Sequence, residues 1–261
     1  MIGKVEKYLL KKIKDDGAIH VTLIDPEDVN PKSGSYIAQA SEKHGTSAIM
    51  VGGSTITSSN HLDAVVAAIK ESVDIPVILF PNNITGISQQ ADAIWFMSLL
   101  NSSDPYFITG AQVLAAPLVR KFGLEPIPLG YLIIGEGGAA AVIGRAIPIP
   151  YNKPELTVAH ALAAQYLGMR FVYLEAGSGV SKPVPCEMVK MVKKTIAVPL
   201  IVGGGIRTGL QANKIVAAGA DIIVTSTALQ EAEKQSLTGK VQEIVEGIKE
   251  GVMDRYNRSV G

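Results

Sequence analysis

The sequence predicts a single (β/α)8 TIM barrel, on the strength of three observations. Short apolar runs rich in β-branched residues alternate with helix-like segments along almost the whole chain. Most of these runs are continuously apolar, which is typical of parallel strands covered on both faces. Eight such runs with helices between them, in 261 residues, match the size of one barrel domain. A doubly wound sheet is the second interpretation.

The elements follow in order. Residues 1–17 mix charged and apolar side chains, and we expect a short amphipathic helix there. The expected strands are Ile19–Ile24, Ala48–Val51, Pro76–Phe80, Ala93–Met97, Pro128–Ile134, Phe171–Leu174, Pro199–Val202 and Asp221–Val224. The expected helices are Tyr36–His44, Leu62–Ser72, Pro105–Phe122, Glu155–Leu167, Glu187–Lys194, Leu210–Ala218 and Gly239–Tyr256.

One connection departs from this alternation. After Phe80, residues 81–93 read PNNITGISQQADA, which contains too many Asn, Gly and Ser residues for a helix. We therefore predict that the third crossover lacks its helix. Neither a low-complexity segment nor an interdomain linker interrupts the chain, so residues 1–261 are predicted to form one domain.

The composition narrows the class of protein. With 47% hydrophobic and 18% charged residues, the chain is not expected to be disordered. Lys and Arg balance Asp and Glu at 24 each, so no long-range field attracts nucleic acid or an anionic membrane. The single cysteine, Cys186, excludes an internal disulfide and suits a reducing compartment.

The mean hydropathy of +0.26 raises the question of a membrane span. No apolar run reaches the roughly 18–20 residues that spanning requires. The most apolar stretch, residues 127–150, is interrupted by Glu136, Arg145 and several glycines. The first residues also lack the apolar core of a signal peptide. We therefore expect a cytoplasmic protein without a transmembrane segment.

Glycines and hydroxyl residues gather where strands seven and eight are expected to end. Gly203-Gly204-Gly205 follows one of these strands and Thr225-Ser226-Thr227 follows the other. In such turns several backbone N–H groups converge on an anion, which glycine allows to approach closely. These two loops form the usual phosphate site of a barrel. A phosphorylated substrate is predicted; the alternative is that the glycines only form a tight turn.

A third glycine turn follows the sixth strand. Glu175 ends this strand, and Ala176-Gly177-Ser178-Gly179 would leave a small polar hollow beside it. A carboxylate at the carboxyl end of a barrel strand can accept a proton from a substrate hydroxyl or bind a cation. A surface glutamate that caps the loop is the alternative.

Asp25 follows directly on the first strand, so we expect its side chain at the mouth of the barrel. A carboxylate beside a phosphate site commonly holds Mg²⁺, which takes one or two protein ligands together with phosphate oxygens and water. The second strand ends in Gly52-Gly53-Ser54-Thr55, whose hydroxyls would lie on the same rim. No cluster of His and Cys suggests zinc. We interpret the scattered His20, His44, His61 and His160 as structural or exposed.

These segments resemble the geranylgeranylglyceryl phosphate synthase family. The resemblance rests on LIDP at 23–26, VGGS at 51–54, YLEAGSG at 173–179 and GGGIR at 203–207, and it extends to FMSLLNS at 96–102 and to residues 153–170. YLEAGSG is the most specific of these segments, because other phosphate-binding barrels share the glycine loops. The family's barrel also lacks its third helix, in agreement with the loop after Phe80.

The resemblance implies the activity. The family joins sn-glycerol 1-phosphate to an allylic prenyl diphosphate through an ether bond, with release of pyrophosphate, in archaeal-type phospholipid biosynthesis. For this chain it implies a Mg²⁺-dependent phosphoglycerol geranylgeranyltransferase that uses geranylgeranyl diphosphate. It also implies a homo-oligomer whose contact with a membrane surface is at most transient. No nucleic-acid partner is expected.

The resemblance also assigns roles to individual residues. Asp25 and Ser54 would hold Mg²⁺, and Glu175 would accept the proton of the attacking hydroxyl. sn-Glycerol 1-phosphate would be bound by Tyr173, Leu174, Glu175, Ala176, Gly177, Ser178, Gly179, Gly204, Gly205, Ser226 and Thr227. The family commonly has glycine at the position of Ser226, where serine would be strained if the turn required a positive φ.

A prenyl chain requires an apolar groove, for which the sequence offers several segments. These are Phe80–Ile87, Trp95–Leu100, Tyr131 and the tract Gly135–Gly144. Core or subunit packing is the alternative for Trp95 and Phe96, and the tract is either a mobile cover or a passive turn. Two other functions remain open at this point. One is a phosphosugar isomerase or lyase, which needs no groove; the other is a sensor that binds a phosphorylated metabolite without turnover.

Overall fold

A computed structural model describes residues 2–55, 58–226 and 234–260. Its strands pair in chain order, each parallel to the next, and the last strand pairs with the first. They are β1 (Ile19–Ile24), β2 (Thr46–Val51), β3 (Val77–Leu79), β4 (Ala93–Leu99), β5 (Glu125–Ile133), β6 (Phe171–Glu175), β7 (Leu200–Gly203) and β8 (Ile222–Thr225). This closed sheet confirms the predicted barrel and excludes the doubly wound alternative.

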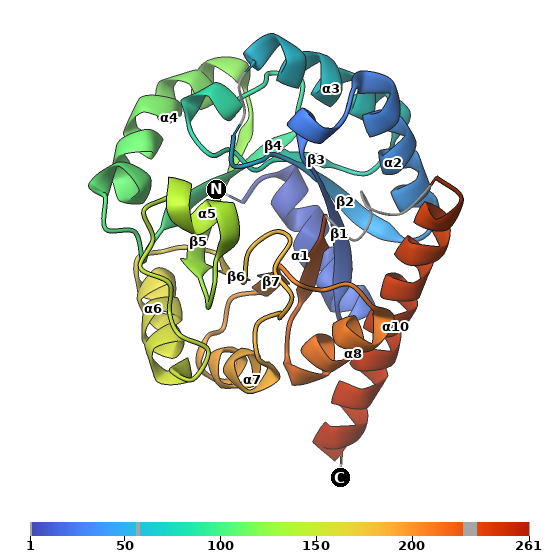
Figure 1. Cartoon of the computed structure of the whole chain (residues 1–261), viewed down its shortest axis with the longest axis vertical. Helices are drawn as coiled ribbons and strands as arrows, with labels where there is room; N and C mark the ends of the chain where they lie inside the picture. The colour runs from blue at the N-terminus through green and yellow to red at the C-terminus, as the bar shows by residue number, and fades with distance from the viewer. Residues whose placement is uncertain (1, 56–57, 227–233, 261) are drawn as a thin grey trace.

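Helices cover the outside of the barrel, as Figure 1 shows. They are α2 (Pro31–Lys43), α3 (Ser59–Ser72), α4 (Ala111–Phe122), α6 (Pro154–Tyr166), α7 (Cys186–Thr195), α8 (Gly209–Ala218) and α10 (Lys234–Val260). The long α10 packs along α8 and reaches α2, so the last helix meets the first helix of the ring. α2 begins five residues before its expected start, because Asn30 accepts a hydrogen bond from Ser33 N at 3.0 Å and Pro31 occupies the first turn.

The connection from β3 to β4 contains no α-helix, and all of its residues belong to the described part of the chain. It holds a single 3₁₀ turn, η2 (Ile84–Gly86). Asn83 Oδ1 accepts a hydrogen bond from Thr85 N at 2.7 Å, which favours a turn over a helix. The predicted absence of the third helix is therefore confirmed.

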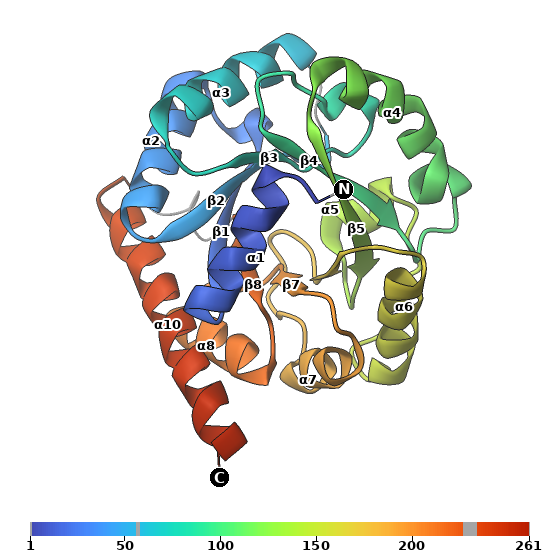
Figure 2. The ribbon, with the colours of Figure 1, turned by 180° about the vertical axis from the view of Figure 1, so that it is seen from behind.

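The amino-terminal helix α1 (Lys4–Asp16) closes one end of the barrel, in front in Figure 2. Leu9 is fully buried among the side chains inside the barrel. The Glu125 carboxylate accepts hydrogen bonds from the backbone N–H groups of Val5 and Glu6, at 2.8 and 2.9 Å. The Glu6 carboxylate in turn pairs with Arg170 at 2.7 Å. The carboxyl ends of the strands lie at the other end of the barrel, which we call the mouth.

Two further elements lie near this mouth. The expected helix Pro105–Phe122 begins instead with a π-helical turn, η3 (Tyr106–Gly110), whose Ile108 carbonyl accepts a hydrogen bond from Ser98 Oγ at 2.7 Å. A short helix, α5 (Gly138–Ile143), lies within the glycine-rich tract and was not predicted. Among the described residues, no helix has both the length and the apolar character needed to cross a bilayer.

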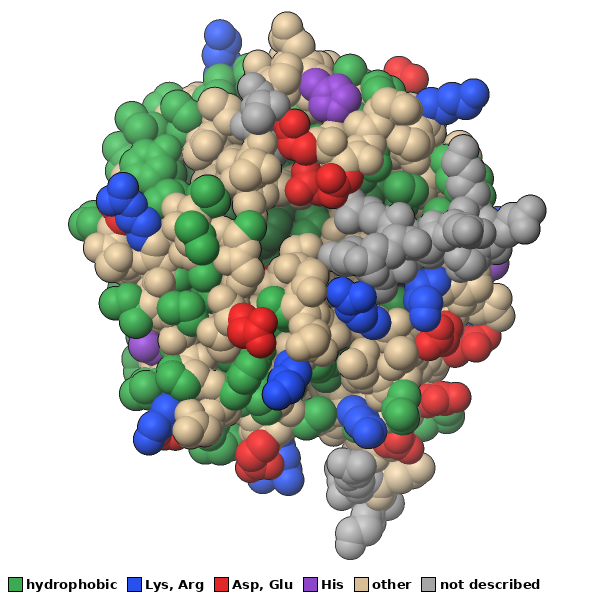
Figure 3. All heavy atoms as spheres, viewed as in Figure 1, with side chains coloured by type: hydrophobic (Ala, Val, Ile, Leu, Met, Phe, Trp, Pro, Cys, Tyr) green, Lys and Arg blue, Asp and Glu red, His purple; other side chains and the backbone are tan. Residues whose placement is uncertain are grey.

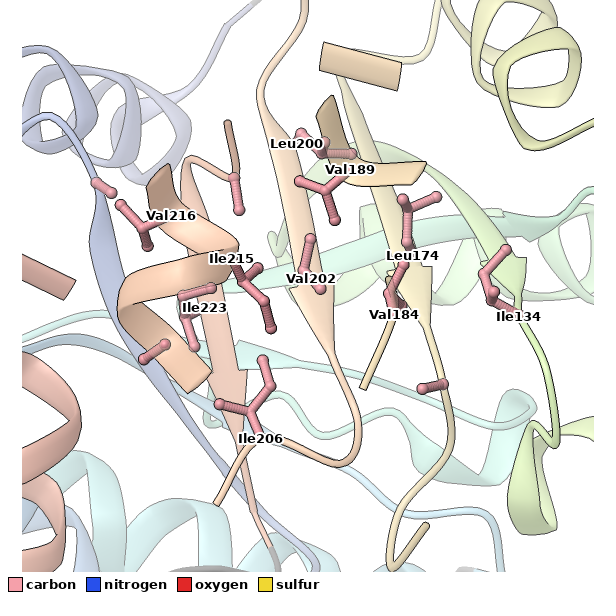
Figure 4. Close-up of a cluster of buried hydrophobic side chains, with 14 of the residues drawn as sticks. Ile134, Leu174, Val184, Val189, Leu200, Val202, Ile206, Ile215, Val216 and Ile223 are labelled. Carbon is pink, nitrogen blue, oxygen red and sulfur yellow. The ribbon is translucent and has the colours of Figure 1, made fainter. Parts of the chain in front are cut away.

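Apolar side chains lie on both faces of the sheet. One layer fills the barrel and includes Trp95, Ile127 and Phe171. Outer layers lie between the strands and the helices, and Figure 4 shows the part in which Leu174 and Val202 face Val189 and Ile215. Because both faces are covered, the strands are continuously apolar, and their ends are fixed in position at the mouth.

Candidate active site

One cavity opens at the carboxyl ends of the strands and continues sideways between β3, β4 and α4. Figure 3 looks onto this face, which is hollowed near its centre beside a group of acidic side chains. The residues of what we call the polar end are Asp25, Asp28, Ser54, Glu175, Ser178, Gly179, Gly204, Gly205, Arg207 and Ser226. Those of the apolar end are Ile87, Ile94, Phe96, Met97, Leu99, Phe107, Ala111, Ala115, Ala140 and Ile143. The two ends are continuous.

Glu175 lies at the end of β6 with only 6% of its surface exposed. Its Oε1 accepts a hydrogen bond from Gly177 N at 2.6 Å, which fixes the carboxylate at the floor of the polar end. Burial raises the pKa of the Glu175 carboxyl above its ordinary value of 4.5, against the opposing effect of hydrogen bonds to the charged form. A carboxylate in this setting binds a proton more strongly than an exposed glutamate does.

The glycines of β7 leave room for this arrangement. A side chain at Gly203 would collide with the hydroxyl of Tyr173. At Gly204, where φ is +81°, a Cβ atom would lie 2.5 Å from both Glu175 Oε1 and Gly177 N. Glycine is therefore required here for two reasons, the left-handed backbone and the closeness of the neighbouring chain.

Asp25 lies across the mouth from Glu175, at the end of β1. Its Oδ1 accepts a hydrogen bond from Glu27 N at 3.0 Å, so the carboxylate caps the turn η1 (Pro26–Asp28). A side chain at Gly53 would collide with this carboxylate, which places Asp25 against the loop that carries Ser54. Partial burial raises the pKa of the Asp25 carboxyl.

The oxygen donors here suit a hard cation that shares its coordination with a bound phosphate. Asp25, Asp28 and Ser54 all line the polar end, and Mg²⁺ prefers one or two carboxylates combined with phosphate oxygens and water. Within the described ranges, no group of three or more His, Cys, Asp or Glu side chains could enclose a metal ion. A cation at this position would therefore depend on oxygens of a ligand.

Most of the predicted site residues meet in the cavity. These are Asp25, Ser54, Tyr173, Glu175, Ser178, Gly179, Gly204, Gly205 and Ser226. Leu174 and Ala176 do not line it, because their side chains are buried in the outer layer, where Figure 4 shows Leu174. Gly177 also lies outside the lining but contributes its N–H to Glu175.

The backbone conformation of the turn after β8 shows whether Ser226 is strained. Among the residues that the structure describes, Arg145 is the only non-glycine residue with a positive φ. Ser226 therefore does not occupy the left-handed region and is not strained in that way. Thr227 lies outside the described residues.

Three aromatic rings lie together in the lining of the cavity. Phe80 follows β3, whereas Tyr131 and Tyr173 belong to β5 and β6, and all three line the cavity. The ring centroid of Phe80 is 5.4 Å from that of Tyr131 and 5.6 Å from that of Tyr173, and the two tyrosine rings are 5.3 Å apart. Burial and the nearby Glu175 charge raise the pKa values of both tyrosines well above 10.

Two of the histidines, His20 and His61, occupy structural positions. His20 is buried in the barrel, where its ring nitrogens bond the hydroxyls of Thr46 and Thr225 at 2.8 and 2.9 Å, and desolvation lowers its pKa to about 3. His61 Nε2 lies 2.8 Å from Pro26 O and 3.0 Å from Val29 O. Because both partners are acceptors, this nitrogen carries the proton, and His61 holds the turn that follows Asp25.

The wall contributed by α4 was not predicted. Ala111 and Ala115 line the apolar end one helical turn apart, Gln112 beside them also lines the cavity, and η3 adds Phe107. The small residues at an i, i+4 spacing were a signal for a helix face that leaves space beside it. Arg207 and Asp28 were also missed as residues of the polar end. The predicted groove segments do contribute Phe80, Ile87, Trp95, Tyr131 and Ile143.

Comparisons with known proteins agree along the whole barrel. A model of the PcrB family matches residues 10–248. The geranylgeranylglyceryl phosphate synthase of Thermofilum pendens is 52% identical over 255 residues, which are 98% of this chain and 99% of that protein. The synthase of Thermococcus gammatolerans is 55% identical over 249 residues, 95% of this chain and 98% of that protein.

A solved structure also has a closely similar fold to that of this chain. It is the crystal structure of (S)-3-O-geranylgeranylglyceryl phosphate synthase from Thermoplasma acidophilum in complex with its substrate sn-glycerol-1-phosphate. The TM-score is 0.91 at 42% sequence identity, and the match covers 96% of this chain and 100% of the other.

Proposed function

The chain belongs to the PcrB family, as the resemblance to geranylgeranylglyceryl phosphate synthases implied, and on this premise we propose that it joins sn-glycerol 1-phosphate to geranylgeranyl diphosphate. The reaction forms an ether bond and releases pyrophosphate, in archaeal-type membrane phospholipid biosynthesis. The observation that carries the proposal is the single cavity in which a glycine-lined polar end continues into an apolar channel. A phosphorylated alcohol and a prenyl diphosphate need these two environments side by side.

The residues of the polar end can perform the transfer. Glycerol phosphate binds at the turns around Gly177, Gly204 and Ser226, where backbone N–H groups receive the phosphate. Its hydroxyl then lies beside the Glu175 carboxylate. As the oxygen of this hydroxyl bonds to C1 of the prenyl group, the proton passes to Glu175. The C1–O bond to the diphosphate breaks, and its electron pair leaves with pyrophosphate.

We further propose that the reaction depends on Mg²⁺, held by Asp25 and Ser54. The ion would supply positive charge to the leaving diphosphate oxygens. The support is the donor set described above, which is incomplete without ligand phosphates. The chain itself contributes the half-buried Asp25, whose position depends on Gly53 and on the turn that His61 holds.

The other two functions fit the cavity less well. A phosphosugar isomerase or lyase would use the polar end but has no need of a channel lined by Ile94, Phe96 and Ala115. A sensor would not require a buried carboxylate with a raised pKa beside the phosphate turns.

Transfer of radiolabel from geranylgeranyl diphosphate to glycerol phosphate tests the proposal. We expect ether product with sn-glycerol 1-phosphate and Mg²⁺, much less product with the mirror-image 3-phosphate, and none after chelation with EDTA until Mg²⁺ is restored. Saturable binding of glycerol phosphate without any product would instead favour the sensor. Turnover of a phosphosugar in the absence of a prenyl donor would favour the isomerase.

We also propose that the protein is a cytoplasmic homo-oligomer. Several large apolar side chains of α4, of α5 and of the segment that follows α5 are exposed, among them Val113, Leu114, Val142 and Ile147. Such side chains support contact with another copy of the chain or transient contact with a membrane surface. Analytical ultracentrifugation with and without lipid vesicles separates these two cases.

A further inference from the structure

Three neighbouring strand ends are pressed together beside the proposed Mg²⁺ ligands. A Cβ atom at Gly53 would collide with the Asp25 carboxylate, and a Cβ atom at Gly52 would collide with the carbonyl oxygen of Phe80. The end of β2 therefore packs between the ends of β1 and β3, with no room for a side chain at either glycine. Ser54 follows these two glycines, so its loop is confined on both sides.

Asn82, which follows β3, adds a direct bond to this loop. Its Nδ2 donates a hydrogen bond to Ser54 O at 2.9 Å, and Asn82 lines the cavity. The bond also fixes which way the amide points. A backbone carbonyl oxygen can only accept, so the side-chain atom that faces Ser54 is the nitrogen, and the other atom is the oxygen Oδ1.

This oxygen requires a hydrogen-bond donor. Asn82 Oδ1 is buried and has no hydrogen-bond partner within the described part of the chain. A buried amide oxygen without a partner is costly, and nearly all such atoms are satisfied by protein groups or by ordered water. An ionised diphosphate offers only acceptors, and on the proposed function the reacting hydroxyl of glycerol phosphate lies beside Glu175, across the mouth. A water molecule bound to a cation supplies the donor that is needed.

We propose that Asn82 is a positioning residue of the Mg²⁺–diphosphate site. Its Nδ2 holds the loop that carries Ser54, and its Oδ1 accepts a hydrogen bond from a water molecule of the hydrated cation. This inference rests on the proposed function and adds the end of a third strand to the two ligands assigned there. Mg²⁺ takes few protein ligands and keeps several of its waters, so a group that accepts from those waters helps to fix the ion.

The neighbouring asparagine shows what a purely structural amide does in this loop. Asn83 Oδ1 accepts hydrogen bonds from Thr85 N at 2.7 Å and from Thr85 Oγ1 at 2.6 Å, and so caps the turn η2. The acceptor of Asn83 is therefore used within its own turn. A structural role for Asn82 would explain its Nδ2 but not its Oδ1. Because the amide is neutral, it also adds no repulsion toward the diphosphate, as a further carboxylate would.

Binding of inorganic pyrophosphate, measured by equilibrium dialysis with Mg²⁺ and with EDTA, tests the proposal without turnover. Asn82→Ala removes both interactions of the amide. We expect the affinity for pyrophosphate in the presence of Mg²⁺ to fall by on the order of tenfold, the usual effect of losing a group that supports a metal ligand. The weaker binding of pyrophosphate in EDTA should not change, because Asn82 acts on the hydrated cation. The affinity for sn-glycerol 1-phosphate, which binds at the turns around Gly177 and Gly204, should also stay constant.

Asn213→Ala is the matched control. Asn213 lies on α8, where its Nδ2 donates a hydrogen bond to Asp254 Oδ2 at 3.1 Å, so this variant loses an amide hydrogen bond away from the cavity. Equal Mg²⁺-supported affinities for pyrophosphate in the two variants would overturn the proposal. An equal fall for Asn82→Ala in EDTA, or for glycerol phosphate, would also overturn it, because the role of Asn82 would then be structural.

The unsubstituted chain separates this inference from the function on which it rests. If Mg²⁺ failed to strengthen its binding of pyrophosphate, the proposed Mg²⁺ site would be wrong, and the role of Asn82 with it. If Mg²⁺ strengthened binding equally in the unsubstituted chain and in Asn82→Ala, only the role of Asn82 would be wrong.

Discussion

The two ends of the cavity are built by opposite means. At the polar end, strands β6–β8 lead into turns whose glycines let the backbone approach closely, and single atoms such as Gly177 N fix the carboxylate. At the apolar end, β3 has three residues and no crossover helix follows it, so the space results from an element that is absent. The function of the polar end depends on the exact position of individual groups, whereas that of the apolar end depends on the volume of the channel.

This difference predicts how each end tolerates substitution. Hydrogen bonds and charges lose their effect over fractions of an ångström, whereas the hydrophobic effect is non-directional and scales with buried area. Changes of one atom should therefore inactivate the polar end, whereas the apolar end should tolerate changes until the channel is blocked. Three substitutions at the two ends test this expectation, in order of decreasing effect, and a fourth, at His20, tests a buried position in β1.

Glu175→Gln should have the largest effect. The amide cannot accept the proton of the attacking hydroxyl, so we expect transfer to fall by on the order of 10³-fold, measured as kcat with saturating substrates. Glu187→Gln, at an exposed position on α7, is the matched control and should retain full activity. If the Glu175 variant remained as active as the control, the carboxylate would not be the proton acceptor.

The same variant should not lose stability. Because the pKa of Glu175 is raised in the folded state, the folded protein binds this proton more tightly than the unfolded chain does. The contribution to the free energy of unfolding is therefore largest below pH 4.5 and falls as the pH rises through the folded pKa. Thermal unfolding at pH 7 should show a Tm for Glu175→Gln equal to or above that of the unsubstituted protein.

Gly204→Ala should have the next largest effect. The new Cβ would press on Glu175 Oε1 and Gly177 N, and the left-handed φ disfavours any side chain. A displacement of about 1 Å lowers the rate by about 10²-fold, and we expect such a fall in kcat/KM for glycerol phosphate. Gly239→Ala is the control, because this exposed glycine lies in α10 with no atom within 4 Å of the new methyl group. Similar losses in both variants would argue against the phosphate turn.

Ala115→Phe should affect the apolar end alone. A ring at this position narrows the channel, so we expect kcat/KM for geranylgeranyl diphosphate to fall by about tenfold, the range of a moderately overpacked site. Dimethylallyl diphosphate, which lacks the long apolar tail, should lose much less activity. Val113→Phe on the exposed face of the same helix, at 70% exposure, is the control. Equal losses for both donors would show that the two ends are not separable.

Substitution of His20, which is buried in β1, should have the smallest effect, and this effect is on stability. Its pKa is lowered to about 3 in the folded state, so the fold is destabilised as the pH falls below the ordinary value of 6.5. We expect the free energy of unfolding in urea to fall by about 1 kcal/mol from this residue between pH 7 and pH 5.5. His20→Gln, which cannot titrate, should show a smaller fall over this range. An unchanged pH dependence would mean that the fold does not lower the pKa of His20.

The strands could be predicted well because both of their faces are buried, and β1 agrees with its expected bounds. β5 was predicted to start three residues late, at Pro128, because prolines usually end a strand. Pro126 and Pro128 are tolerated because β6 pairs with β5 only from Leu129 onward, so the side facing β6 needs no N–H group there. This reason depends on a distant segment and is not visible locally.

The polar end was predictable for a related reason. Strand ends are local features, and Asp25, Glu175 and Gly204 each follow directly on an apolar run. The apolar end depends on contacts between segments far apart in sequence, so the role of Ala111 and Ala115 on α4 was missed. The short α5 was missed because its glycines and alanines form no amphipathic pattern. It lies at the mouth because Gly137 N donates a hydrogen bond to Ala176 O at 2.9 Å.

The absent third helix has a consequence for what completes the fold. Elsewhere around the barrel a helix seals the outer face of the sheet, but beside β3 and β4 the side chains of Ile87, Ile94 and Ala115 border a cavity. On the proposed function, the isoprenoid tail occupies this place and removes the same surface from water. The tail of the substrate then covers the apolar surface that a third helix would otherwise cover. When the product leaves, this part of the hydrophobic core is exposed again.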